Sequence, residues 1–396
     1  MMTYEETFGD LEDKSIYLDN AATTPILPEV YYKMEPYIKL FYGNASSKYK
    51  QGEISKRAIE EARSIIAKAI GAEPEEIYFT SGGSEANNWV IKGLRNKFRF
   101  RPMHIISTEF EHHSILEALK YRWNECEDIE CTLISPERSG VISVQDLAEA
   151  FKLNTELVSV MMVNNELGTI QPIIDIGQRC ANNGVIFHTD AVQAFGQLPI
   201  DVEKLNISMM SMSAHKIHGP KGVGALYISN GIKSRMNPLI HGGQQERGMR
   251  ASTENVAAIV GFGKAVEIAM DRMEENFIHK TTLLNYLIEE VQKIPDVYIN
   301  GEVEYNDGHH LNVRIDGVRA EELMAMLDSA NIYISTGSAC NSESKQPSHV
   351  LKAIGLTDSQ ANSSIRISIS DLTTKEELTT FLEYLKQFIK ILRERK

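Results

Sequence analysis

Two residues that could act on a carbonyl compound lie at the ends of consecutive hydrophobic segments. Asp190 ends the strand-like segment 184–190, and Lys216 follows the apolar run 207–212. A lysine amine serves enzymes mainly as a Schiff-base nucleophile, and pyridoxal phosphate (PLP) is its commonest carbonyl partner. PLP also needs an acidic residue at its pyridinium nitrogen. Taken alone, Lys216 would be an exposed lysine beside a turn. Because α/β folds bind ligands at the edge where strands end, we expect Lys216 and Asp190 to form one site.

A glycine-containing segment, 79–88, could bind the phosphate of such a cofactor. It follows a short apolar segment and leads into a helical pattern that contains Trp89, Val90 and Leu94. Backbone N–H groups and the helix dipole at such a helix start attract phosphate, and Gly83 and Ser84 are the candidates here. Most glycine turns before helices are only turns, so this interpretation depends on Asp190 and Lys216.

One of the four cysteines has the surroundings of a nucleophile. So few cysteines in 396 residues indicate no disulfide framework, which suits a reducing compartment. Cys126 and Cys131 have no partner at metal-ligand spacing and are interpreted as structural, and Cys180 lies in a helical run as a core residue. Cys340 lies in a small, polar segment that would expose its thiol, whereas inert cysteines are usually buried. We therefore expect a catalytic thiol at Cys340 and no metal site.

Composition narrows the class of protein. The chain is 42% hydrophobic and long enough for two or three domains. A net charge of −13 disfavours a broad nucleic-acid surface, since phosphate backbones are bound by clustered Lys and Arg. The N-terminus has no apolar signal region, and no stretch approaches the ~20 apolar residues of a membrane span. We expect a cytoplasmic protein without direct nucleic-acid or membrane partners.

Hydrophobic periodicity predicts an α/β architecture. Residues 54–69 follow helical spacing, with Gly71 as the stop. The middle of the chain alternates strand-like runs with helical ones, which predicts a mostly parallel sheet. The pattern becomes mainly helical over 255–294, as expected of a crossing between domains, and the remainder is typical of a smaller α+β unit.

Several longer motifs resemble the cysteine desulfurase family of fold-type I PLP enzymes, along most of the chain. The matching segments are 17–25, 43–47, 79–88, 111–114, 163–168, 188–193, 211–224, 246–250, 337–340 and 364–368. The Gly-Ser-Ala-Cys-Asn segment around Cys340 resembles the NifS/IscS-like class with a long cysteine loop rather than the SufS-like class with a short one. The chain departs from the family pattern at Gln244, at Ala251-Ser252 and at Ser208.

The resemblance implies an aspartate aminotransferase-like fold with two domains. The large PLP-binding domain would comprise residues 24–262. The small domain would comprise 1–23 and 263–396 and carry the cysteine loop and Arg366.

The resemblance also implies a role for each matching residue. Lys216 would hold PLP covalently and move a proton at the substrate Cα, and Asp190 would pair with the ring nitrogen. His112 would stack on the ring and act as an acid or base, while Arg366 would bind the amino-acid carboxylate. The other implied positions are Gly83, Ser84, Ser213 and His215 for the phosphate, Asn165 and Gln193 for the ring oxygen or substrate carboxylate in either order, Asn44 for the substrate, and Thr253 for the phosphate of a neighbouring subunit.

The implied activity is removal of sulfur from L-cysteine. The products would be L-alanine and a persulfide on Cys340, which a homodimeric enzyme passes to an acceptor protein. Iron–sulfur cluster assembly, tRNA thiolation, cofactor synthesis and DNA sulfur modification all remain open as pathways. An aminotransferase, a selenocysteine lyase and a non-catalytic scaffold are the alternatives, although transamination needs no second nucleophile and a scaffold would not need to retain the catalytic residues together.

Overall fold

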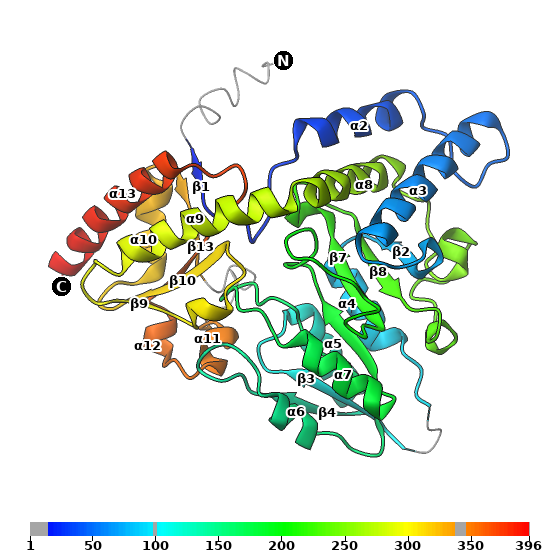
Figure 1. The fold of residues 1–396 in the computed structure, drawn as a ribbon, viewed down its shortest axis with the longest axis horizontal. Coiled ribbons are helices and arrows are strands. Elements are labelled where there is room, and N and C mark those ends of the chain that lie inside the picture. Colours follow the sequence, from blue (N-terminus) through cyan, green and yellow to red (C-terminus); the bar gives the residue numbers. More distant parts are fainter. Residues whose placement is uncertain (1–14, 98–100, 337–345, 396) are drawn as a thin grey trace.

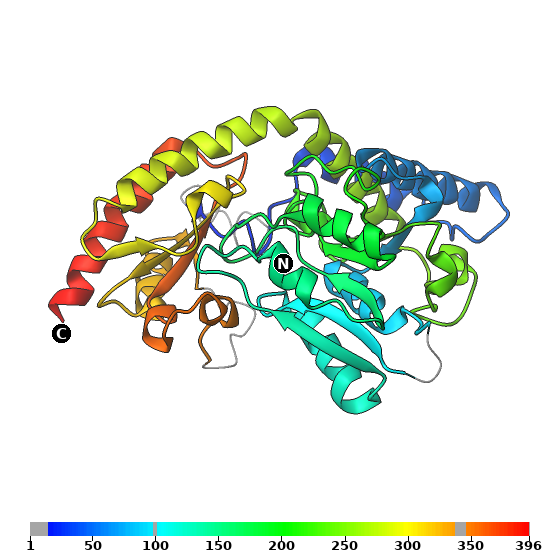
Figure 2. The same ribbon diagram turned by 60° about the horizontal axis from the view of Figure 1, so that its bottom comes forward.

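A computed structural model describes residues 15–97, 101–336 and 346–395. The expected nucleophile Cys340 lies outside these ranges. Figure 1 shows two units side by side, with the helices α8 (Val256–Asp271) and α9 (Met273–Val291) running from one to the other. Figure 2 shows the same two helices as a nearly continuous rod along one side of both units. The helical segment expected between the domains is therefore present.

A seven-stranded sheet forms the centre of the larger unit. Its strands, in spatial order, are β2 (Ile77–Thr80), β8 (Gly224–Ile228), β7 (Met209–Ser213), β6 (Ile186–Asp190), β5 (Thr155–Ser159), β3 (Met103–Thr108) and β4 (Ile129–Ile134). All neighbours pair in parallel except β8, which runs antiparallel to both β2 and β7. The prediction of a mostly parallel sheet is confirmed.

Helices cover this sheet, as the apolar character of its buried strands requires. They are α2 (Pro28–Lys39), α3 (Lys50–Ala69), α4 (Gly83–Gly93), α5 (His113–Tyr121), α6 (Val144–Glu149), α7 (Ile173–Asn183) and α8. The helix expected over 54–69 is α3, which begins four residues earlier. Gly71 follows its C-terminus with φ +70°, a conformation that favours glycine.

The smaller unit is built on a four-stranded antiparallel sheet. Its order is β12 (Ser335–Thr336), β13 (Ser364–Ser368), β10 (His310–Ile315) and β9 (Val297–Ile299). The helices α9, α10 (Ala320–Asp328) and α13 (Lys375–Glu394) accompany this sheet. Near the start of the chain, β1 (Ile16–Tyr17) pairs in parallel with β11 (Ile332–Tyr333), so these early residues belong with the smaller unit.

Each unit has its own hydrophobic core. In the larger unit, a first core is formed mainly by residues between Leu27 and Ile268, and a second cluster by residues between Tyr78 and Met236. The core of the smaller unit is formed by Leu18 with residues between Leu283 and Leu392. The short helices α11 (His349–Ala353) and α12 (Asp358–Ala361) are an exception, because their buried side chains pack with the first core. Among the described helices, none is long and apolar enough to cross a membrane.

Candidate active site

A cavity of about 310 Å³ lies where β6 and β7 end, between the two units. Ten residues that the sequence singled out line it, namely Gly83, Ser84, His112, Asn165, Asp190, Gln193, Ser213, His215, Lys216 and Arg366. They come from segments spread over almost 300 positions of the chain. The fold therefore brings most of the predicted site residues into one place.

Lys216 and Asp190 reach the cavity from neighbouring strands. Asp190 is the last residue of β6, and Lys216 ends the 3-10 turn Ala214–Lys216 that follows β7. The Lys216 Nζ donates to the carbonyl oxygens of Ala21 and Ala22, the latter at 2.8 Å. Both Asp190 oxygens accept hydrogen bonds, from the Val192 backbone N–H at 2.9 Å and from Asn87 Nδ2 at 2.6 Å. These two hydrogen bonds fix the Asp190 carboxylate at the cavity wall.

Another part of the cavity wall suits a phosphate. Gly82 has φ +154°, and a Cβ on Gly83 would lie 2.5 Å from a methyl carbon of Val192, so the turn requires glycine. The Ser213 hydroxyl is buried and has no hydrogen-bond partner within the described part of the chain. A phosphate would supply the missing acceptor, and the backbone N–H groups at the start of α4 add to the attraction. These residues fit the phosphate group of PLP.

His215 also lies at this end of the cavity. Its Nδ1 is 3.2 Å from the Thr23 hydroxyl oxygen. Burial, together with the charges of Lys216 and Lys221, lowers the pKa of His215 to about 4. The imidazole is therefore neutral at physiological pH and can offer a hydrogen bond rather than a charge to a phosphate.

Arg366 lies on β13 of the smaller unit and faces the cavity with a buried guanidinium. One terminal nitrogen donates to Asp19 at 2.6 Å and the other to the Asn165 carbonyl oxygen at 2.8 Å. Its Nε has no partner among the residues that the structure describes. Asp19 fixes the orientation of the fork, and the remaining N–H groups suit the two-point recognition of a carboxylate.

Two buried carboxyl groups near the cavity were not predicted from the sequence. Burial raises the pKa of Glu166 to about 7, although Ser348, which donates its hydroxyl at 2.6 Å, and Arg366 both oppose this shift. Burial also raises the pKa of Glu111 to about 8. Both residues belong to motifs noted in the sequence, but a motif alone does not reveal that a carboxyl group is enclosed.

Three of the predicted site residues are not placed at the cavity. Asn44 is exposed, with its side-chain oxygen accepting from the Ser46 backbone N–H, and Thr253 is exposed as well. Neither lines the cavity of the single chain. Cys340 lies outside the described residues. Of the other cysteines, Cys180 is buried, as its helical position predicts, and Cys126 is exposed.

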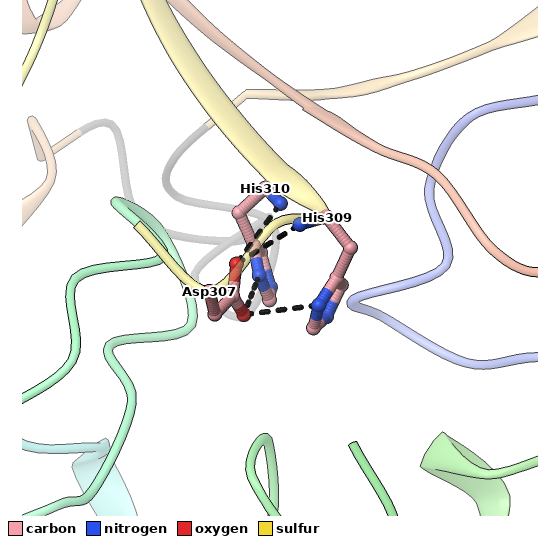
Figure 3. A group of neighbouring side chains, drawn as sticks. All are labelled: Asp307, His309 and His310. Carbon is pink, nitrogen blue, oxygen red and sulfur yellow. Dashed lines mark hydrogen bonds and ion pairs between the residues drawn. The ribbon is translucent and has the colours of Figure 1, made fainter. Parts of the chain in front are cut away.

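A second group of titratable side chains lies at the start of β10 and does not line the cavity. Figure 3 shows Asp307 with the rings of His309 and His310 on the same side. One carboxylate oxygen lies 3.0 Å and 2.7 Å from the two Nδ1 atoms, and the other accepts from both backbone N–H groups at 3.2 Å. Three ligand atoms so close could hold a metal, but these are hydrogen-bond separations, and the cation Lys280 lies near enough to act on His309. Hydrogen bonds from His310 and from the loop backbone hold Asp307, whereas His309 Nδ1 and His310 Nε2 have no hydrogen-bond partner within the described part of the chain.

Comparison with known proteins defines the class. A model of the aminotransferase class-V family matches residues 16–381. A protein of Methanosarcina thermophila named cysteine desulfurase IscS is 45% identical over 96% of this chain and 94% of that protein. A solved structure titled NifS-like protein has a TM-score of 0.89 at 35% identity, covering 95% of this chain and all of that one. A second, titled SspA in complex with cysteine, has a TM-score of 0.79 at 38% identity, covering 91% of this chain and all of that one.

The chain belongs to the aminotransferase class-V family and, within it, to the cysteine desulfurases of the NifS/IscS-like class. This family depends on PLP, so the fit of the cavity to that cofactor agrees with the family to which the chain belongs.

Proposed function

We propose that this protein removes sulfur from L-cysteine, releases L-alanine and keeps the sulfur as a persulfide on Cys340. The observation that carries this proposal is a single cavity with Lys216 and Asp190 at one part of its wall and Arg366 at another. An amino acid whose carboxylate is bound by Arg366 would present its amino group toward Lys216. The identity with proteins named cysteine desulfurase supports cysteine as that amino acid.

PLP supplies a carbonyl that joins covalently to lysine or substrate nitrogen and a ring that stabilises negative charge at Cα. The residues of the chain do the rest. Lys216 moves a proton at the substrate Cα, Asp190 keeps the ring nitrogen protonated, and the Ser213 hydroxyl and Gly83 hold the phosphate. Gln193, whose amide already donates to the Ala21 carbonyl at 3.1 Å, and Asn165 flank the ring and the substrate.

The sulfur step needs no external oxidant. The Cys340 thiolate attacks the substrate sulfur, so that an S–S bond forms while the C–S bond breaks. The electron pair of the C–S bond remains on carbon, which takes up a proton and becomes the methyl group of alanine. The thiol is required as a thiolate, because the neutral thiol is a weak nucleophile.

The wider organisation is part of the same proposal. The large domain would comprise residues 24–262 and the small domain 1–23 and 263–396. The hydrophobic clusters support this division except for residues 265–268 at the end of α8 and for α11 and α12, which pack with the first core. Thr253 would serve the cavity of a neighbouring subunit in a homodimer, which accounts for its exposure in one chain, and Asn44 remains a proposed substrate contact. The persulfide would pass to an acceptor protein, with iron–sulfur cluster assembly in the cytoplasm as the proposed pathway.

Replacing the lysine tests the proposal. Lys216→Ala should fold, lose the absorbance of covalently bound PLP and form no alanine from cysteine, because the covalent link depends on its amine. The exposed Lys204→Ala serves as the control and should keep both properties. Alanine formation by Lys216→Ala at the wild-type rate would contradict the assignment. Sedimentation tests the dimer, which a fully active monomer would contradict.

A further inference from the structure

The ring of His112 is attached to the start of a helix through one of its two nitrogens. His112 is the N-cap of α5, and its Nδ1 accepts from the backbone N–H of Ser114 at 3.1 Å. A backbone N–H can only donate, so Nδ1 must carry a lone pair. The Ser114 hydroxyl lies 2.7 Å from the same nitrogen. In a neutral ring the proton is therefore on Nε2, the nitrogen that remains for the cavity.

The Ser114 hydroxyl is in turn oriented by a buried amide. Asn87 on α4 donates through Nδ2 to Ser114 Oγ at 2.9 Å and to Asp190 Oδ2 at 2.6 Å. The reversed amide would set two acceptors, the Asn87 oxygen and the Asp190 carboxylate, against each other. Because Ser114 Oγ accepts from Asn87, its own proton is available for His112 Nδ1. Asn87 thus donates in both directions, to Asp190 and to Ser114, and Ser114 in turn donates to His112.

Protonation of His112 to the imidazolium would have to occur at Nδ1. The added proton would lie against the Ser114 backbone N–H and would force the Ser114 hydroxyl proton to turn away. We propose that Ser114 and Asn87 are positioning residues that keep His112 neutral with its proton on Nε2, so that His112 enters the reaction as a hydrogen-bond donor and not as the general base. Helix N-termini hold imidazoles neutral in this way at other active sites, where the neutral ring polarises its target. The inference rests on the proposed function, and it leaves the proton transfers to Lys216.

The charges around the ring agree with this state. Burial lowers the pKa of His112, Asp190 opposes the shift, and Lys216 and His113 lower the pKa further. His349 on α11 lies beside His113, with ring centroids 4.4 Å apart and the planes tilted by 46°. Burial lowers the pKa of His349 to about 4, so it adds little positive charge at neutral pH. Among the described residues, Asp190 is the negatively charged group that favours the imidazolium, and Asn87 connects it to His112 through Ser114.

The direct test is the protonation state of His112, measured by nitrogen NMR on protein labelled at histidine nitrogens, with the signal assigned through His112→Gln. Without cofactor, the wild type should show a bare Nδ1 and a protonated Nε2 from pH 6 to 9. Ser114→Ala should raise the pKa of His112 by about one unit, because one donor to the lone pair is lost. Ser114→Thr keeps the hydroxyl and should behave as the wild type.

Ser143→Ala is the matched control, because Ser143 also caps a helix, α6, with its side chain and does not line the cavity. It should leave the His112 signals unchanged. A proton on Nδ1 or an imidazolium at pH 7 in the wild type would overturn the inference, whether or not the enzyme desulfurates cysteine.

Activity supplies a second and separate readout. If His112 only donates a hydrogen bond, His112→Gln keeps an N–H donor and should retain at least tenfold more alanine formation than His112→Ala, since one such donor contributes about 100-fold or more at an active site. Equal loss in the two variants would contradict the donor role. A neutral ring in an inactive wild type would instead count against the proposed function alone.

Discussion

Asp190 and Asp307 are both almost fully buried and lie near histidines, Asp190 at the end of β6 and Asp307 just before the start of β10, yet their surroundings differ in one respect. Asp307 is enclosed by its own loop, in which two backbone N–H groups and the rings of His309 and His310 use both oxygens. Burial works against its ionised form, but these neighbours hold the pKa of Asp307 below its usual range. The carboxylate is fully used within the protein, which is typical of a structural group.

Asp190 instead borders a cavity in which polar groups lack partners. The Ser213 hydroxyl and the Arg366 Nε are buried without partners among the described residues, and both belong to the lining of this cavity. Unpartnered buried groups cost free energy unless something binds them. His309 Nδ1 and His310 Nε2 beside Asp307 also lack hydrogen-bond partners among the described residues, but neither histidine lines this cavity. Burial, histidine neighbours and unpartnered atoms therefore do not identify a functional carboxylate by themselves, and the cavity that Asp190 borders makes the difference.

The largest expected effect is on catalysis at Asp190. Asp190→Asn should lower kcat for alanine formation by at least about 100-fold, because a neutral amide no longer keeps the PLP ring nitrogen protonated. Folding should be retained, since the new amide oxygen can still accept from Val192 and Asn87 can turn its free oxygen toward the new N–H group. Activity within threefold of the wild type would show that the Asp190 carboxylate is not required for catalysis.

Asp307→Ala should act on stability. The change leaves two backbone N–H groups and two imidazoles without their acceptor in a buried loop, and should lower the free energy of unfolding by about 3 kcal/mol. Urea denaturation measures this, with Asp307→Asn as the milder variant because it keeps the acceptor for the backbone. A stable Asp307→Ala protein with kcat reduced as far as in Asp190→Asn would contradict the distinction between the two sites.

Glu111, a third buried carboxyl group, should make the free energy of unfolding depend on pH. Its raised pKa, about 8 in the folded protein against 4.5 ordinarily, means that folding favours the protonated form. The unfolding free energy should therefore fall as pH rises between about 4.5 and 8. Relative to Glu111→Gln, which has no proton to lose, the wild type should lose on the order of 2 kcal/mol between pH 5 and 9.

Urea denaturation of the cofactor-free proteins at both pH values makes this measurement. The exposed Glu109→Gln controls for the loss of a charge in the same segment. An identical pH dependence in the wild type and Glu111→Gln would show that Glu111 ionises as freely in the fold as in the unfolded chain.

The smallest expected effect is on stability, at the helix cap Thr374 in the smaller unit. Its hydroxyl accepts from the Glu377 backbone N–H at 3.2 Å, while Glu377 accepts from the Thr374 N–H at 2.7 Å, so the pair caps α13. Thr374→Ala should cost about 1 kcal/mol in the free energy of unfolding and leave kcat unchanged. A clear change in kcat would mean that the end of the smaller unit is coupled to the cavity.

The sequence was sufficient where local patterns carry the information. Alternating apolar strands and helices predicted a mostly parallel sheet, and the strand ends placed Asp190 and Lys216 together. The direction of β8 was not readable, because an apolar run has the same composition in either direction. The packing of α11 and α12 with the first core was not predicted either, since both short helices follow segments of the smaller unit.

Side-chain contacts between residues far apart in the sequence could not be predicted either, because they depend on how the elements pack. Asn87 contacts Asp190 across 103 positions and Ser114 across 27. The sequence showed Asn87 only as a member of a glycine-turn motif, and its role depends on how α4 and α5 pack together. Likewise, only the folded chain shows Asp19 beside Arg366 and the enclosure of Glu166.

The location of the sulfur after turnover is the most direct test of persulfide formation on Cys340. The protein would be given L-cysteine carrying a heavy sulfur isotope, without an acceptor, and its peptides analysed by mass spectrometry. We predict one heavy sulfur atom added to the peptide that contains Cys340, in step with the alanine released, and none in Lys216→Ala. Heavy sulfur on Cys126, Cys131 or Cys180 instead, or alanine release without any labelled peptide, would contradict the account.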